Sequence, residues 1–212
     1  MFKILYSLCD KLSVFTKIMQ NNEAFYLFIS LETDGVGHFF SQTVIRIAMV
    51  VTNVNQEVLS LESFFVRNGA TKLVYNPCNY TLEQVNNGVR PRHAAHRVMQ
   101  YVLQVVQNGG LIVAHNMNFV DQLLLHIGVD LKPFYSFTRC TMREGVNLCQ
   151  IGTPGKYKYP QLIELSTFLF PESVVNLGFS SAEEKAWAVQ KCFFEMKNKY
   201  IDVYEKRDNA VC

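Results

Sequence analysis

Two short stretches of the sequence combine positive charge with groups suited to contact nucleic acid. In one, Arg90, Arg92 and Arg97 fall within eight positions. Arginines in such a cluster can contact phosphates, helped by the positive end of a helix that begins beside them. In the other, Lys156 and Lys158 alternate with tyrosines whose rings can stack on bases. The arginine cluster has a second interpretation, in which its charges form the solvated face of a helix.

Carboxylate and histidine side chains stand where two apolar runs end. Ser30 and Glu32 lie two apart near the end of the run 25–32, so in a strand they face the same way. His115 directly follows the run 111–114. Ligands of α/β sheets bind beyond the carboxyl ends of central strands, so a site is expected in these two regions. A histidine at the end of a buried strand is typically a hydrogen-bonded core residue, and we interpret His115 as structural.

The apolar runs predict the strands of a sheet. Residues 25–32 are rich in aromatics and end at a Thr-Asp-Gly turn, which favours a central strand. Residues 44–52 and 56–67 are β-branched runs around a short polar loop, which is typical of an antiparallel hairpin. Residues 111–114 and 134–142 are the expected fourth and fifth strands.

Helical periodicity follows the hairpin. A short helix is expected at 81–86, a longer one begins at Pro91, and others cover 115–128, 160–170 and the chain from Ala182 onward. Ser181 and Glu184 predict a capping box at the start of the last helix. The order of strands and helices implies an α/β fold: a mixed five-stranded sheet with helices on both faces.

Composition gives little further guidance to function. The 212 residues are 49% hydrophobic and carry a formal net charge of +2, so no general basic excess announces nucleic acid. The six cysteines lack the spacing of a disulfide framework or a zinc site, which predicts free thiols in a reducing compartment. No apolar run is long enough for a membrane span. We expect a soluble intracellular protein, cytoplasmic or nuclear.

Residues 1–22 predict an amphipathic helix that precedes the domain at 23–212. One narrow apolar stripe is formed by Met1, Leu5, Leu8, Leu12, Phe15 and Met19. The stripe suits a helix that packs on its own domain. Further apolar residues flank it, so the alternative is docking to a second copy or to a protein partner.

The chain resembles the DnaQ-like 3′–5′ exonucleases of the DEDD superfamily, which have a ribonuclease H-like fold. The resemblance covers about residues 24–202 and is carried by the stretches FISLETDGVG, LIVAHNMNFVDQLLL, CTMREGVNLCQIG, YKYPQLIELSTFLF and SSAEEKAWAV. The third and fourth stretches resemble a variant found in exonucleases of large DNA viruses, which suggests a viral origin. Counted with the third and fourth stretches as one motif, four motifs in the right order imply the fold.

The resemblance also implies where the family's catalytic residues would fall. Its four carboxylates hold two divalent ions, and a histidine activates the attacking water. The corresponding positions here are Ser30, Glu32, Val120, Ser180 and Lys185. Val120 offers no lone pair and Lys185 brings a positive charge, so a two-metal site is not expected. We expect instead an ion pair between Glu32 and Lys185, because Glu32 would otherwise stay uncompensated.

Other acids stand close to these positions in sequence. Asp34 follows Glu32 by two residues, Asp121 adjoins Val120, and Glu183 and Glu184 precede Lys185. A one-residue offset on a helix rotates a side chain by about 100°, so Asp121 is expected to point away from the direction of Val120. Glu184 is expected to serve the helix cap. A site rebuilt from displaced acids is the alternative.

The resemblance and its departures together predict a catalytically degenerate exonuclease-fold protein that binds single-stranded nucleic acid or acts as a scaffold. No cofactor is expected in that case. One alternative is a divergent metal-dependent 3′–5′ exonuclease on DNA or RNA, which would use Mg²⁺ or Mn²⁺. Another is a purely structural or interaction protein that uses the amino-terminal helix to form a homodimer or to bind a partner.

Overall fold

The computed structural model describes residues 25–35, 43–74, 78–172 and 179–199. Within these residues, one mixed five-stranded sheet has the order β3-β2-β1-β4-β5. Its strands are β1 (Phe25–Asp34), β2 (Thr43–Asn53), β3 (Val58–Phe65), β4 (Leu111–Ala114) and β5 (Thr138–Cys140). β2 is antiparallel to β1 and β3, whereas β4 pairs in parallel with β1 and β5. The predicted hairpin and mixed sheet are confirmed.

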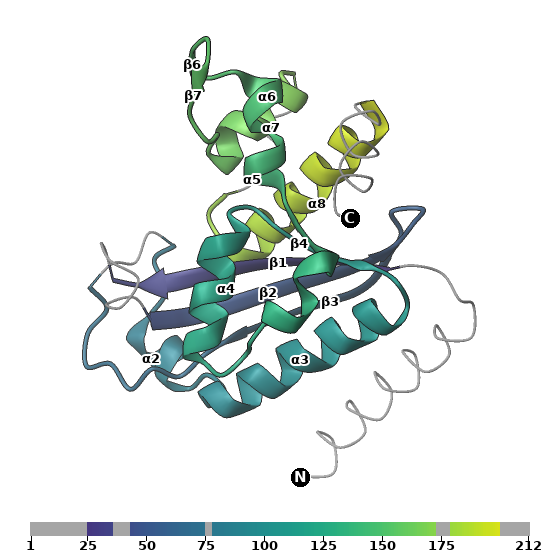
Figure 1. Cartoon of the computed structure of the whole chain (residues 1–212). Coiled ribbons are helices and arrows are strands. Elements are labelled where there is room, and N and C mark those ends of the chain that lie inside the picture. Colours follow the sequence, from purple (N-terminus) through teal and green to yellow (C-terminus); the bar gives the residue numbers. More distant parts are fainter. Residues whose placement is uncertain (1–24, 36–42, 75–77, 173–178, 200–212) are drawn as a thin grey trace.

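Helices cover both faces of the sheet, as predicted (Figure 1). α3 (Pro91–Gln107) and α4 (Met117–His126) pack on one face, α8 (Ala182–Lys199) on the other, and α7 (Leu162–Leu169) against α8. The shorter elements are α2 (Leu82–Asn86), η3 (Lys132–Phe137), α5 (Thr141–Glu144), α6 (Val146–Cys149), and a small hairpin of β6 (Gly152–Thr153) and β7 (Lys156–Tyr157). The elements from α5 to α7 gather on the α8 side of the sheet (Figure 1).

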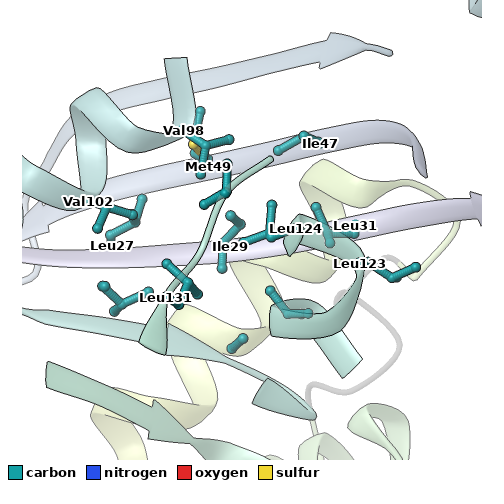
Figure 2. Close-up of a cluster of buried hydrophobic side chains, with 14 of the residues drawn as sticks. Leu27, Ile29, Leu31, Ile47, Met49, Val98, Val102, Leu123, Leu124 and Leu131 are labelled. Carbon is teal, nitrogen blue, oxygen red and sulfur yellow. The ribbon is translucent and has the colours of Figure 1, made fainter. Parts of the chain in front are cut away.

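β1 is buried on both faces, which explains why its sequence is apolar throughout. Leu27, Ile29 and Leu31 point into the core beneath α3 and α4 (Figure 2). Tyr26 and Phe28 point to the other face and pack against α8. The alternation therefore divides the interior into two apolar layers, one on each side of the sheet.

An aromatic cluster holds the carboxyl-terminal half of α8 against β1. The rings of Phe193 and Phe194 lie 5.3 to 5.6 Å from those of Tyr26 and Phe28, measured between centroids, in tilted or edge-on arrangements. The Nζ of Lys197 donates to the Tyr26 hydroxyl over 2.6 Å. This end of the helix is fixed mainly by apolar packing, which such aromatic contacts reinforce.

The fifth strand differs from the prediction. Residues 134–142 were expected to be extended, but β5 covers Thr138–Cys140, between η3 and α5. Pro133 lies in the first turn of η3, where its fixed φ suits a helical turn, and Thr141 already begins α5. The aromatic and β-branched residues of this segment are typical of a strand, but the helical turns on either side leave only three residues extended.

Two further expectations concern the ends of the chain and membranes. Residues 1–22, the expected amphipathic helix, lie outside the described residues. Among the helices that the structure describes, none combines the length and apolar character needed to cross a membrane. The cysteines within the described ranges, Cys78, Cys140, Cys149 and Cys192, are free thiols.

Gly110 provides a test of how tightly β4 joins β1. A Cβ at this position would lie 1.9 Å from the carbonyl oxygen of Phe25, whereas a Cβ at Gly109 would meet no atom within 4 Å. We expect Gly110→Ala to lower the free energy of unfolding by about 3 kcal/mol or more, because backbone must move. Gly109→Ala, at φ +68°, should cost roughly 1–2 kcal/mol. Urea unfolding followed by circular dichroism measures both, and equal losses would contradict the prediction.

Candidate functional site

The carboxyl end of β1 is polar on the face that points to α8. Ser30 and Glu32 continue the alternation of Tyr26 and Phe28, so both lie on that face. Glu32 is 5% exposed, and the register sets it opposite Arg46 of β2. A carboxylate with so little access to water needs a charged or hydrogen-bonding partner.

Lys185, in the first turns of α8, supplies that partner. Its Nζ lies 2.7 Å from Oε1 of Glu32. The side chain of Lys185 is 29% exposed and that of Glu32 is 6% exposed, so the pair is partly shielded from water. The ion pair predicted between these two residues is confirmed.

A second ion pair lies beside the first, and here the acid is on α8 and the cation is on the sheet. Glu183 of α8 accepts hydrogen bonds from the guanidinium of Arg46, through Nε at 3.0 Å and through Nη2, and from the Ser63 hydroxyl. Burial opposes ionisation of Glu183, but the hydrogen bonds from Arg46 and Ser63 outweigh it and hold the pKa of this carboxyl below its usual value. The first turn of α8 is thus joined to β1, β2 and β3.

Aromatic rings and a thiol complete this arrangement. The guanidinium carbon of Arg46 lies 4.2 Å from the ring centroid of Phe65 and 5.3 Å from that of Tyr80. The Cys78 thiol has a pKa raised by burial and by the nearby Glu32 carboxylate. Sequence patterns alone did not identify Arg46, Ser63, Cys78 or Tyr80. The predicted hairpin sets Arg46 opposite residues of the run 56–67, so it gave no signal for the pairing of Arg46 with Glu32, which comes from the register of β2 with β1.

The other positions aligned with catalytic residues take no part in this cluster. Val120 is buried in the apolar core beneath α3 and α4, where it offers no oxygen. Ser180 uses its backbone N–H and its hydroxyl to donate to the Glu184 carboxylate, at 2.8 and 2.6 Å. These bonds to Ser180 hold the pKa of Glu184 below its usual value, and the backbone N–H of Glu184 donates to Ser181. Glu184 therefore serves the helix start, as predicted.

The remaining displaced acids also have other partners. Asp34 accepts a hydrogen bond from the backbone N–H of Val74 at 2.6 Å. Asp121 accepts from the Tyr135 hydroxyl at 2.6 Å, turned away from the core in which Val120 is buried, as expected. In the part of the chain that the structure describes, no group of three or more histidine, cysteine or acidic side chains could hold a metal ion. The two-metal centre that the resemblance implies requires several carboxylates close together.

His115 connects β4 to α5 and to the segment before α7. Its Nε2 lies 3.0 Å from the carbonyl oxygen of Pro160, and its Nδ1 lies 3.0 Å from the hydroxyl of Thr141. A carbonyl can only accept, so Nε2 carries the proton and Nδ1 accepts from Thr141. Burial lowers the pKa of His115 to about 4, which keeps the ring neutral. The interpretation of His115 as structural is consistent with these bonds.

The basic residues are not gathered into one patch. Arg90 and Arg92 are exposed at the start of α3. Arg97 instead turns to Glu62, with Nη1 3.2 Å from a carboxylate oxygen, and its guanidinium lies over the Phe64 ring. The structure therefore separates Arg97 from the other two arginines.

The lysines of the second basic stretch lie in and beside the small hairpin. Lys156 is exposed on β7, and Lys158 follows the strand and forms an ion pair of 2.6 Å with Glu164 of α7. Because Lys158 is paired with Glu164, Lys156 is the exposed lysine of this stretch that forms no ion pair with the described residues.

Replacing Lys185 tests the ion pair directly. Lys185→Met leaves Glu32 buried without its cation, so we expect the free energy of unfolding to fall by about 3–5 kcal/mol. Glu32→Gln added to that variant should restore most of the loss, because no buried charge remains. Lys199→Met, which breaks an exposed ion pair with Glu195, is the control and should cost less than about 0.5 kcal/mol. Equal losses for the two lysine variants in urea unfolding would contradict the prediction.

The lowered pKa of His115 predicts a pH-dependent stability. The ring takes up a proton near pH 6.5 in the unfolded chain but only near pH 4 in the folded protein. Its contribution is therefore complete above pH 6.5 and is lost as the pH falls to 4, by up to about 3 kcal/mol. His115→Asn should lack this loss, whereas the exposed His93→Asn control should keep it. Unfolding free energies at pH 7 and pH 4.5 compare the three proteins; identical pH dependence would disprove the assignment.

Solved structures of E. coli exonuclease I share this fold. The complex with a dT13 oligonucleotide has a TM-score of 0.66 and 14% identity, over 87% of this chain and 43% of that one. The dA16 complex has a TM-score of 0.64 and 13% identity, over 87% and 43%. The zinc-bound complex with single-stranded DNA has a TM-score of 0.65 and 15% identity, over 87% and 42%.

The other two comparisons give no relative. No family model matches the sequence, and no curated protein matches it. This chain spans less than half the length of the exonuclease I chains that it resembles. At this level of identity, the likeness shows a common exonuclease fold.

Proposed function

We propose that this protein uses an exonuclease fold to bind single-stranded nucleic acid without cleaving it. The observation that carries the proposal is the 2.7 Å ion pair between Lys185 and Glu32 at the end of β1. The solved exonuclease I structures with dT13, with dA16 and with single-stranded DNA support the choice of ligand class.

The chemistry of the residues argues against hydrolysis. Two divalent ions a few ångström apart, about 4 Å, need several carboxylates to offset their repulsion and to supply hard oxygen ligands. The Glu32 carboxylate is already paired with the Lys185 ammonium, and Val120 supplies no oxygen ligand. A cation entering beside Glu32 would meet the Lys185 ammonium at short range, which is unfavourable at low dielectric.

The groups that we propose to bind nucleic acid do not depend on a metal ion. The exposed arginines at 90 and 92 and the lysine at 156 contribute charge that can contact phosphates. Discrimination between DNA and RNA rests on contacts to the 2′-hydroxyl, so both are candidate ligands. The intracellular location, the viral origin and a homodimer or protein partner bound through residues 1–22 stay predictions.

A nuclease and binding assay tests the proposal. Single-stranded DNA and RNA labelled at the 3′ end are incubated with Mg²⁺ or Mn²⁺ and either the native protein or Glu32→Gln, whose amide is a poorer metal ligand. We expect the two proteins to give equal background cleavage. Fluorescence anisotropy should show binding of the same oligonucleotides in EDTA, weakening as salt rises.

Two outcomes would overturn the proposal. Metal-dependent cleavage that disappears in Glu32→Gln would mean that displaced acids rebuild a site, and the protein would be a divergent exonuclease. Absence of oligonucleotide binding even at low salt would leave a structural or interaction protein.

A further inference from the structure

An exposed aromatic side chain stands between the small hairpin and α7. Tyr159 is 58% exposed, although burying such a ring stabilises a protein more than burying almost any other side chain. It follows Lys156, Tyr157 and Lys158 directly in the chain. Its neighbour Pro160 is buried, so the exposed ring directly precedes a residue held inside the fold.

The residue after Tyr159 is held at the carboxyl end of β4, the strand that pairs in parallel with the central strand β1. The pairing of β4 with β1 reaches Val113 opposite Phe28, and His115 directly follows Ala114, the last residue of β4. Neighbouring strands are roughly 4.8 Å apart. Because Nε2 of His115 binds the carbonyl oxygen of Pro160, the residue after Tyr159 is fixed beside the end of β4, one strand away from β1.

The backbone on both sides of Tyr159 is anchored. Before it, the backbone N–H of Lys158 donates to Ile151 over 2.8 Å, and the Lys158 ammonium binds Glu164. After it, Gln161 and Glu164 form a capping box at the start of α7. A ring presented on a fixed backbone loses little conformational freedom when a ligand binds, which favours affinity.

The exposed charge near the Tyr159 ring is positive, which suits a polyanionic ligand. Glu164 neutralises Lys158, which leaves the exposed Lys156 as the cation on the hairpin that can contact a phosphate. An accessible ring beside a lysine is the combination by which proteins bind single strands without reading sequence. A duplex would keep its bases stacked and unavailable to the ring.

We propose that Tyr159 is a stacking platform for an unpaired base of single-stranded nucleic acid, with Lys156 contacting the adjacent backbone. This proposal rests on the proposed binding function and names the place where the strand is held. The bound strand lies over the small hairpin and the start of α7, beside the end of β4.

The test measures affinity for a fluorescein-labelled oligothymidylate by anisotropy in EDTA. Tyr159→Ala should weaken binding by roughly fivefold or more, since a stacked base contributes about 1–3 kcal/mol. Tyr159→Phe keeps the ring and should stay within about twofold of the native protein. Tyr135→Ala removes another exposed tyrosine, 50% exposed on η3, and should leave binding unchanged.

Two further measurements separate stacking from charge. A 2-aminopurine base in the oligonucleotide should lose fluorescence on binding the native protein and Tyr159→Phe, and much less on binding Tyr159→Ala. Lys156→Gln should reduce the slope of log affinity against log salt by about 0.7, the contribution of one phosphate contact on a single strand.

The outcomes distinguish this proposal from the one on which it rests. If the native protein binds the oligonucleotide and Tyr159→Ala binds equally well, the stacking platform is wrong while the binding function stands. If the native protein binds no oligonucleotide at low salt, both are wrong. Equal thermal unfolding temperatures of the variants establish that each is folded.

Discussion

A buried carboxylate at the end of the central strand is the constraint around which this fold is arranged. Glu32 lies between two apolar layers at 5% exposure, where an unpaired charge would cost several kcal/mol. Lys185 relieves that cost from α8, a helix that follows Glu32 in the chain by more than 150 residues. The start of α8 must therefore approach the sheet closely, while the aromatic cluster around Phe193 sets the other end.

The ion pair between Arg46 and Glu183 adds a second link between the start of α8 and the sheet. Arg46 and Glu32 are opposite one another on β2 and β1, so their charges alternate across the sheet. Along α8, Glu183 precedes Lys185. Glu183 pairs with Arg46, and Lys185 pairs with Glu32. A rotation or shift of α8 would bring like charges together. The two pairs thus bear on the position of the helix as well as on its attachment.

Much of the fold could be predicted because β1 is buried on both faces and β2 and β3 form a hairpin, patterns that the local sequence records directly. The bounds of β5 could not, because a strand of three residues is set by its parallel partner β4 rather than by its own residues. In the site, the pairing of Glu32 with Lys185 was predictable from the charges at two aligned positions. The pairing of Glu183 with Arg46 depends on helix rotation and strand register, which are tertiary properties.

The charges at the end of β1 also limit how a nucleic acid could be held there. Glu32, Arg46, Glu183 and Lys185 cancel in pairs, so this cluster adds no net attraction for phosphate. Affinity must then come from groups around it, such as Arg90 and Lys156, and from contacts that need no charge. Stacking on an anchored ring meets that requirement, because it uses the face that every base presents. In the proposed binding mode, stacking on the faces of the bases therefore contributes where this cluster of paired charges does not.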